Sequence, residues 1–209
     1  MHCGLDEAGR GPVIGPMVIA MVCGDPKYFS RIGARDSKEL SDARRREIYA
    51  ALMEGPVSVR FTVVSPEELN QKMDNMTLNQ IELEKYAAII QESPGDAIVF
   101  VDSFDVNPVR LQDTLRSLTG RKVYCHHHAD RDYPVVSAAS IVAKVIRDDE
   151  IERLKARYGE IGSGYPSDPL TVRFLKHAVE TGMDIHEIAR LKWKTFQRIA
   201  SVGRNRKLF

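Results

Sequence analysis

Apolar positions along the chain predict a sheet made of short strands. Residues 57–64 alternate apolar and polar side chains, which is typical of a half-buried strand. Residues 97–101 form an unbroken apolar run, as in strands that are buried on both faces. Apolar runs at residues 2–5 and 13–23 predict two more strands on either side of a turn rich in Gly and Pro. Residues 121–125 are a weaker fifth candidate.

Helical patterns separate the later strands and then occupy the rest of the chain. Amphipathic spacing, N-cap residues and a first-turn proline predict helices at residues 41–53, from about 77, 107–118, 136–158, 169–181 and 185–200. A glycine-rich loop follows residue 158. Strands that alternate with helices and then give way to helices predict an α/β fold, a mixed sheet with helices on both faces and a helical C-terminal subdomain.

Composition and charge refine this picture at one end of the chain. With 43% hydrophobic and 28% charged residues in 209, the chain is of the globular, core-forming kind rather than disordered. The net charge is only +1, but from residue 190 onward there are seven basic residues and no acidic one: Arg190, Lys192, Lys194, Arg198, Arg204, Arg206 and Lys207. This tail predicts contact with an anionic polymer, and a solubilising tail is the alternative.

Cysteine and histidine positions argue against a zinc site. Cys3, Cys23 and Cys125 are far apart and form no Cys-x-x-Cys pair, which also disfavours a disulfide framework and fits a reducing compartment. The run at residues 126–128 is predicted to be a polar strand end. No apolar run approaches the roughly 18 residues of a membrane span, and no secretory signal is found. We therefore expect a soluble, cytoplasmic protein that needs to be no more than a monomer.

Candidate chemistry lies where strands end. Asp6 and Glu7 follow the first predicted strand and Asp102 follows another, which is where open α/β sheets place their sites; Asp130 is a fourth candidate. Converging carboxylates repel one another unless a divalent cation such as Mg²⁺ or Mn²⁺ is present. Alternatively, these are solvated turn residues. Neighbouring residues face opposite sides of an ideal strand, so Asp6 and Glu7 can share a site only if the strand ends or bulges there.

The turn Gly9-Arg10-Gly11 is not a dinucleotide fingerprint, because Ile14 replaces the third glycine and Pro12 leads into a strand. Its glycines can bring bare backbone close to a ligand, beside a permanent cation. A tight hairpin turn with a solvated arginine is the alternative, and the spacing does not decide between the two.

Several blocks of the sequence together resemble the ribonuclease HII family, in its archaeal branch. The resemblance covers residues 1 to about 170 and rests on Asp6-Glu7-Ala8-Gly9-Arg10-Gly11-Pro12, Asp36-Ser37-Lys38, Val101-Asp102-Ser103, the Asp130 segment running into Ser137-Ala138-Ala139-Ser140-Ile141-Val142-Ala143-Lys144, and Gly164-Tyr165. It implies a ribonuclease-H-like fold with a mixed five-stranded sheet. It further implies a catalytic domain at residues 1–165 and a basic, substrate-binding helical subdomain at residues 166–209.

The resemblance also implies the activity and the site. The expected reaction is cleavage of RNA in RNA–DNA hybrids and incision 5′ of single ribonucleotides in duplex DNA, with two divalent ions and with 3′-hydroxyl and 5′-phosphate products. The implied catalytic and metal-binding residues are Asp6, Glu7, Asp102 and Asp130, with Asp132 a less fitting rival of Asp130. The implied substrate-binding residues are Gly9, Arg10 and Gly11 at the 2′-hydroxyl, Tyr165 at the RNA–DNA junction sugar, and Lys38, Ser140 and Lys144 at phosphates.

Two other functions remain as alternatives. A junction-resolvase type of nuclease would use similar carboxylates, but a DNA-only enzyme has no need of the 2′-hydroxyl probe that residues 9–11 and Tyr165 would form. A non-catalytic hybrid-binding module gains nothing from carboxylates that face phosphate. A replication clamp is a further possible partner of the last residues, 206–209, although these show no clear clamp-binding pattern.

Overall fold

The predicted strands form one mixed five-stranded sheet. The computed structural model describes residues 1–34 and 40–206, with side chains up to residue 202, so Lys38 and Lys207 lie outside the described residues. The strands are β1 (His2–Ala8), β2 (Met17–Gly24), β3 (Ser58–Val64), β4 (Ile98–Asp102) and β5 (Lys122–His126), in the order β3-β2-β1-β4-β5. β1 is antiparallel to β2 and parallel to β4, and β5 is parallel to β4. The predicted fold class is confirmed.

The chain divides into two compact units. The first, here called the sheet unit, comprises Met1–Ala8, Val18–Thr62 and Asn79–Ile146. The second unit comprises Gly9–Met17, Val63–Leu78 and the chain from Arg147 onward. The division after residue 165 into a catalytic and a substrate-binding part concerns function and stays a prediction.

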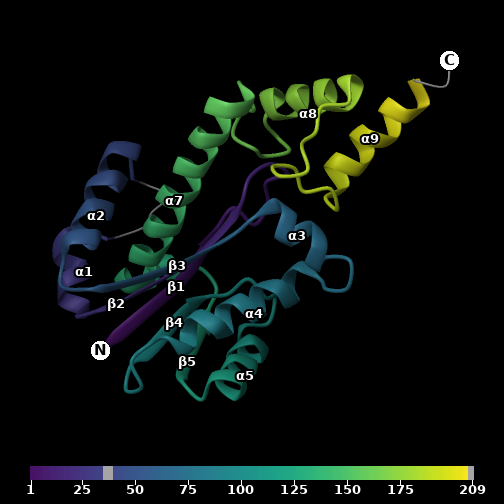
Figure 1. The fold of residues 1–209 in the computed structure, drawn as a ribbon. Coiled ribbons are helices and arrows are strands. Elements are labelled where there is room, and N and C mark those ends of the chain that lie inside the picture. The colour runs from purple at the N-terminus through teal and green to yellow at the C-terminus, as the bar shows by residue number, and fades with distance from the viewer. Residues whose placement is uncertain (35–39, 207–209) are drawn as a thin grey trace. The chain divides into compact units, whose positions relative to one another are not determined.

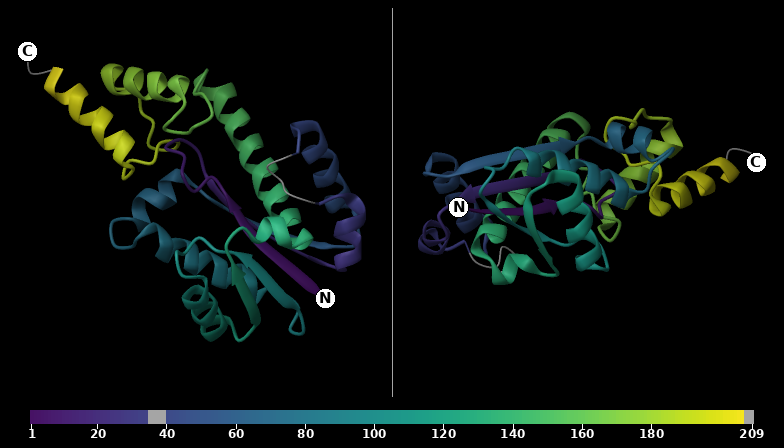
Figure 2. Two further views of the ribbon diagram at one scale, coloured as in Figure 1. Left: turned by 180° about the vertical axis from the view of Figure 1, so that it is seen from behind. Right: turned by 90° about the horizontal axis from the view of Figure 1, so that it is seen from below.

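Helices cover both faces of the sheet in the sheet unit (Figures 1 and 2). One face carries α1 (Pro26–Ile32), α2 (Asp42–Glu54) and the sheet-unit part of α7 (Pro134–Tyr158), and the other carries α4 (Leu78–Gln91) and α5 (Pro108–Thr119). On the first face Val18, Ala20 and Val22 of β2 pack into one buried cluster with residues of α2 and α7. A Cβ at Gly4 would lie 2.2 Å from the Val135 carbonyl oxygen, so α7 begins directly against β1.

Local signals in the sequence account for where these helices begin. Ser41 accepts a hydrogen bond from the Arg44 amide at the start of α2, and Asn107 does the same for the Arg110 amide at the start of α5. Such caps satisfy amides that the first helical turn leaves without partners. The predicted helices at residues 41–53 and 107–118 are therefore confirmed to within one residue at each end.

The second unit contains α3 (Pro66–Lys72), the last part of α7, α8 (Pro169–Thr181) and α9 (Lys194–Arg206). The predicted helix at residues 185–200 is wrong in its first half, because α9 begins only at Lys194. Residues 189–191 bond outward instead: the Asn70 side chain binds the Ala189 carbonyl and the Leu191 amide, at 2.9 and 2.8 Å. The Arg190 amide donates to the Val13 carbonyl. A helix would need these backbone groups for itself.

Two further expectations need correction. The strand predicted from residue 13 begins at Met17, because Gly15 has φ 88°, in the left-handed region rather than the extended one. The argument against disulfides is wrong for one pair, since Cys3 and Cys23 are bonded. They are 20 residues apart in sequence, but the antiparallel register of β1 and β2 sets them directly opposite each other.

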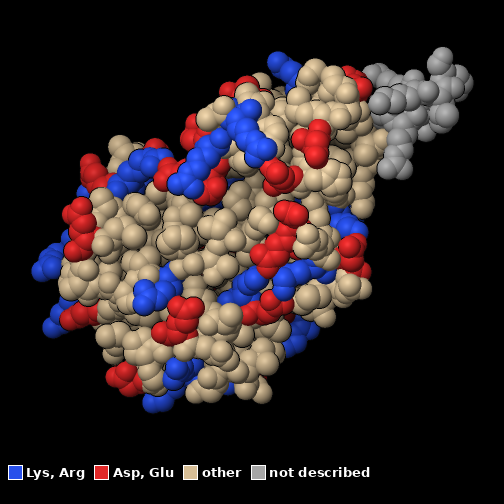
Figure 3. Space-filling model, viewed as in Figure 1, with Lys and Arg blue, Asp and Glu red and all other residues tan. Residues whose placement is uncertain are grey.

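The surface charge differs from the sequence prediction at the start of the basic tail. Arg190 is fully buried, and Lys192 forms an ion pair with Asp74, so neither adds an unscreened charge to the tail. Figure 3 shows lysines and arginines interspersed with acidic residues over the face in view. Among the helices in residues 1–34 and 40–206, none combines the length and apolar character needed to cross a bilayer.

Candidate active site

Three carboxylates meet at one edge of the sheet. One oxygen from each of Asp6, Asp102 and Asp130 lies within 4.8 Å of the others. Asp6 and Asp130 are buried, and Asp102 is half-buried. Among the described residues, this is the one group of acidic, histidine or cysteine side chains that could hold a metal ion.

The strand pairing explains why these carboxylates converge. β1 and β4 are parallel, and their pairing ends with Leu5 opposite Val101, so the next residues, Asp6 and Asp102, follow on neighbouring strands at the same level. Asp130 lies in α6 (Ala129–Asp132), which follows β5. The Ala129 amide donates a 3.0 Å hydrogen bond to Oδ1 of Asp102, which holds the start of α6 at the end of β4.

Burial and mutual repulsion shape the electrostatics of this cluster. Burial raises the pKa of the Asp6 carboxyl well above its usual range, and the charges of Glu7 and Asp102 raise it further. A hydrogen bond with the Ser140 side chain and one from the Glu7 amide, at 2.8 Å, oppose the shift. Asp6 therefore resists ionisation without a compensating cation.

Glu7 takes a different direction from Asp6, as neighbouring residues of a strand do. β1 continues through Ala8, so the strand does not end at the acidic pair. Oε2 of Glu7 accepts a hydrogen bond from the phenol of Tyr86 in α4. Burial, and then the negative charges of Glu7 and Asp6, raise the pKa of the Tyr86 phenol, so it remains a donor. The metal-ligand role of Glu7 stays a prediction.

Tyr86 is a residue of this site that the sequence did not reveal. Its position in the helical pattern is on the apolar side of α4, where a tyrosine would be interpreted as a core residue. A buried tyrosine hydroxyl nevertheless needs a polar partner. This requirement was the one feature of the sequence that could have suggested a role for Tyr86. Glu82, one turn earlier in α4, is also fully buried and adds to the negative charge around the phenol.

The remaining candidates of the sheet unit lie on α7 and α6. Ser140 is buried at Asp6, and Lys144 follows it by one helical turn, on the same side of α7. Asp132 is exposed, whereas Asp130 is 1% exposed and belongs to the carboxylate group. Asp130, and not Asp132, thus lies together with Asp6 and Asp102. Phosphate binding by Ser140 and Lys144 stays a prediction.

The candidates for recognising RNA belong to the second unit. Gly9 has φ 82°, and a Cβ there would lie 2.6 Å from the Pro16 carbonyl oxygen. The ideal Cβ position of the exposed Gly11 lies 3.8 Å from a ring carbon of Tyr165. The turn and the tyrosine are therefore neighbours, which the sequence separation of more than 150 residues could not show.

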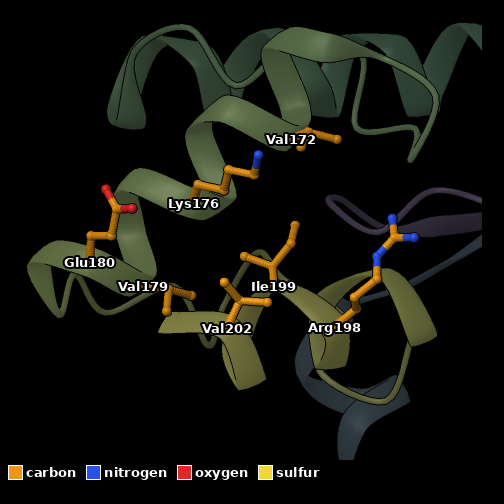
Figure 4. Close-up of a pocket in the computed structure, with 7 residues that line it drawn as sticks. All are labelled: Val172, Lys176, Val179, Glu180, Arg198, Ile199 and Val202. Atoms are coloured by element: carbon orange, nitrogen blue, oxygen red, sulfur yellow. The ribbon is translucent and has the colours of Figure 1, made fainter. Parts of the chain in front are cut away.

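A separate cavity lies between α8 and α9 (Figure 4). It has a volume of about 340 Å³ and is lined by Val172, Lys176, Val179, Glu180, Arg198, Ile199 and Val202. Its walls are apolar side chains of the two helices, with charged groups around them. None of the predicted site residues lines it, so it is not the candidate active site.

The strand order, the flanking helices and the acidic edge define the class of ribonuclease-H-like enzymes. A solved ribonuclease H2 from Pyrococcus horikoshii shares the fold with a TM-score of 0.88 and 38% identity, over 97% of this chain and 98% of that one. A structure of the PCNA:RNase HII complex from Archaeoglobus fulgidus matches with a TM-score of 0.87 and 45% identity, over 93% and 95% of the two chains.

Sequence comparison identifies the family within this class. The sequence profile of ribonuclease HII matches residues 3–196. Ribonuclease HII of Thermoplasma volcanium is 46% identical over 199 residues, which are 95% of this chain and 92% of that protein. The chain belongs to the ribonuclease HII family and is a ribonuclease H enzyme, as the sequence resemblance predicts.

Asp6→Asn is expected to stabilise the metal-free protein at neutral pH. The pKa of the Asp6 carboxyl is higher in the folded than in the unfolded protein, so the folded state binds this proton more tightly. The stability of wild type therefore falls as the pH rises above about 4, the pKa of an aspartate in the unfolded chain. Asn carries no charge and escapes this loss, so the variant should be more stable than wild type at pH 7 and the difference should grow with pH. Urea unfolding in chelator at several pH values measures the difference. A destabilised variant at pH 7, or a difference that does not grow with pH, would contradict the expectation.

Proposed function

We propose that the protein incises duplex DNA on the 5′ side of single embedded ribonucleotides, in addition to cleaving the RNA strand of hybrids. The products would carry 3′-hydroxyl and 5′-phosphate ends. The observation that supports this most directly is the meeting of Asp6, Asp102 and Asp130 where the parallel pairing of β1 with β4 ends. This arrangement suits hydrolysis of a phosphodiester, whose charge has to be neutralised as the bond breaks.

The donor set of this site fits divalent cations. Its ligands are hard carboxylate oxygens, with no sulfur or imidazole in the group of three, which suits Mg²⁺ or Mn²⁺. Asp6, Asp102 and Asp130 would hold them, with Glu7 as a fourth ligand. When bound, a pair of such ions supplies an activated water and neutralises charge on the leaving 3′-oxygen.

Side chains around the carboxylates would keep them in position. The phenol of Tyr86 donates a hydrogen bond to Oε2 of Glu7 and would thereby fix the orientation of this carboxylate. The Ala129 amide occupies Oδ1 of Asp102 in the same way. Lys144 would contact a phosphate near Ser140. The role of each is orientation or charge, since no covalent intermediate is needed.

Discrimination between RNA and DNA would depend on residues 9–11 and Tyr165. Backbone groups of a glycine-rich turn can donate to a 2′-hydroxyl without the bulk of side chains. The Arg10 side chain would contact the adjoining phosphate, and the ring of Tyr165, which is 38% exposed, would stack on a sugar. Lys38, outside the described residues, would add a further phosphate contact.

The test uses a labelled DNA duplex with one ribonucleotide, an all-DNA duplex and a long hybrid, each with Mg²⁺, Mn²⁺ or chelator. We expect metal-dependent incision 5′ of the lone ribonucleotide and no cleavage of the all-DNA duplex. Cleavage of the long hybrid alone would remove the junction role of Tyr165. Cleavage of all-DNA would favour a resolvase-like nuclease, and metal-independent binding without any cleavage would favour a binding module.

We propose a sliding clamp as a protein partner. This proposal is supported by the relative from Archaeoglobus fulgidus, 45% identical, whose structure is that of a complex with PCNA. The candidate contact is residues 206–209, of which 207–209 lie outside the described residues, although these four residues show no clear clamp-binding pattern. A monomeric state and a cytoplasmic location stay predictions.

A further inference from the structure

A fully buried arginine lies behind the Gly9-Arg10-Gly11 turn. The guanidinium of Arg190 donates from Nη2 to the Gly9 carbonyl at 2.6 Å, from Nη1 to the Arg10 carbonyl at 3.1 Å and from Nε to the Gly15 carbonyl at 2.9 Å. Its side chain has no exposed surface, and its Cζ lies 4.9 Å from the centre of the Trp193 ring. All of these residues belong to the second unit.

Only arginine can make this set of contacts. Its planar fork presents donors on three nitrogens in fixed directions, whereas a lysine ammonium is a single point. Hydrogen bonds from a charged, buried donor are also stronger than neutral ones. Arg190 therefore fixes three carbonyl directions over residues 9–15 at once.

Fixing two of these carbonyls also fixes two amides. In a trans peptide the N–H of the next residue points opposite to the carbonyl, and no peptide bond among the described residues is cis. With the Gly9 and Arg10 carbonyls directed at Arg190, the amides of Arg10 and Gly11 point away from the buried guanidinium. Gly11 is exposed, so a ligand can approach the turn at this residue.

A second buried arginine, Arg147, contacts the loop that carries Tyr165. Arg147 donates from Nη2 to the Ser163 carbonyl at 2.7 Å, and its Cζ lies 4.9 Å from the centre of the Tyr165 ring. The Gly164 carbonyl in turn accepts from the Val13 amide at 2.8 Å. Contacts of the two arginines and the Val13–Gly164 hydrogen bond thus connect the turn with the loop that carries Tyr165. Within this network, Arg190 binds the turn.

We propose that Arg190 is a positioning residue for recognition of the 2′-hydroxyl: it orients the Arg10 and Gly11 amides as the donors that tell a ribonucleotide from a deoxyribonucleotide. This rests on the proposed function of the turn. Arg190 itself does not touch the substrate. Its loss would therefore reduce the preference for RNA more than it reduces affinity for nucleic acid in general.

The experiment compares the dissociation constants for an all-DNA duplex and for the same duplex with one ribonucleotide, in chelator to prevent hydrolysis. The ratio of the two is the preference for the ribonucleotide. Arg190→Met is expected to lower this ratio by about 10-fold or more, because a site that loses its directed donors loses discrimination. The dissociation constant for all-DNA should stay within about 2-fold of wild type, since phosphate contacts dominate it. Arg190→Lys keeps the charge and should still lower the ratio.

Leu175→Ala is the matched control for a change in stability alone. Leu175 is fully buried in the core of the second unit and does not belong to the turn. This variant should lower the midpoint of thermal unfolding and leave the ratio as in wild type. If Arg190→Met does not fold, Arg190→Lys decides the question, with circular dichroism to show that it is folded.

The outcomes separate this inference from the proposed function. A folded Arg190 variant with the wild-type ratio would overturn the positioning role and leave the proposed function intact. A wild-type ratio of one, together with no incision at a lone ribonucleotide in Mg²⁺ or Mn²⁺, would overturn the proposed function itself. A ratio that falls equally in Leu175→Ala would also overturn the positioning role, because stability alone would then explain it.

Discussion

Asp102→Asn is expected to lower metal-dependent cleavage of a hybrid by about 1,000-fold or more, with little change in fold. Asn has nearly the same shape, and its side-chain oxygen can still accept the hydrogen bond from the Ala129 amide. What is lost is one negative charge from the group with Asp6 and Asp130. A 1,000-fold loss corresponds to roughly 4 kcal/mol of transition-state stabilisation, a reasonable share for one carboxylate of a divalent-metal site.

The measurement is a single-turnover rate at saturating Mg²⁺ and again with Mn²⁺, alongside hybrid affinity in chelator. Asp113→Asn is the matched control, since Asp113 is a well-exposed aspartate of α5 and should leave the rate unchanged. Affinity for the hybrid should survive in Asp102→Asn, because removing a negative charge does not weaken contact with phosphate. A rate within 10-fold of wild type would remove Asp102 from the mechanism.

The parts of the fold that the sequence predicted well are those with local causes. Residues 57–64 and 97–101 do coincide with β3 and β4 to within one residue at each end, although the burial expected from their patterns is wrong in part: Phe61 and Val63 of β3 are exposed, and β4 alternates buried with half-buried positions. Helices with side-chain caps were placed to within a residue or so. The irregular segment before α9 was not predictable in this way, because its backbone bonds to Asn70 and Val13, more than 100 residues away.

The carboxylate group was predictable because it depends on a general property of parallel sheets. Asp6 and Asp102 directly follow the last paired residues of two neighbouring parallel strands, Leu5 and Val101, and such positions meet at one edge of the sheet. The partner of Glu7 was not predictable. The pattern shows Tyr86 on the inner side of α4, but which polar atom its hydroxyl meets depends on how α4 packs over β1.

Arg190 shows the limit of charge counting along a sequence. Seven basic residues without an acidic one predict a solvated, positively charged tail. The acceptors that let Arg190 be buried are backbone carbonyls of residues 9–15, which every sequence possesses and no composition reveals. The functional consequence is that the tail is less basic than it looks, while the turn near the N-terminus is better ordered than its glycines suggest.

Gly9→Ala is expected to lower incision at a lone ribonucleotide by about 100-fold, far more than a left-handed glycine alone explains. At φ 82° any side chain is strained, and this Cβ would also lie 2.6 Å from the Pro16 carbonyl oxygen and 3.0 Å from Cδ of Arg147. The backbone would have to move, and with it the carbonyl that binds Arg190. Misplacement by about 1 Å in a positioning element typically costs 100-fold in rate.

Gly120→Ala isolates the contribution of backbone strain. Gly120 has φ 67° at the end of α5, and in the described part of the chain a Cβ there would meet no heavy atom within 4 Å. It should cost about 1–2 kcal/mol of unfolding free energy, as for any left-handed alanine, and leave incision unchanged. Urea unfolding and incision rates of both variants, below their unfolding transitions, make the comparison. If the two variants lost incision equally, the close approach at Gly9 would have no part in recognition, and strain alone would account for the glycine.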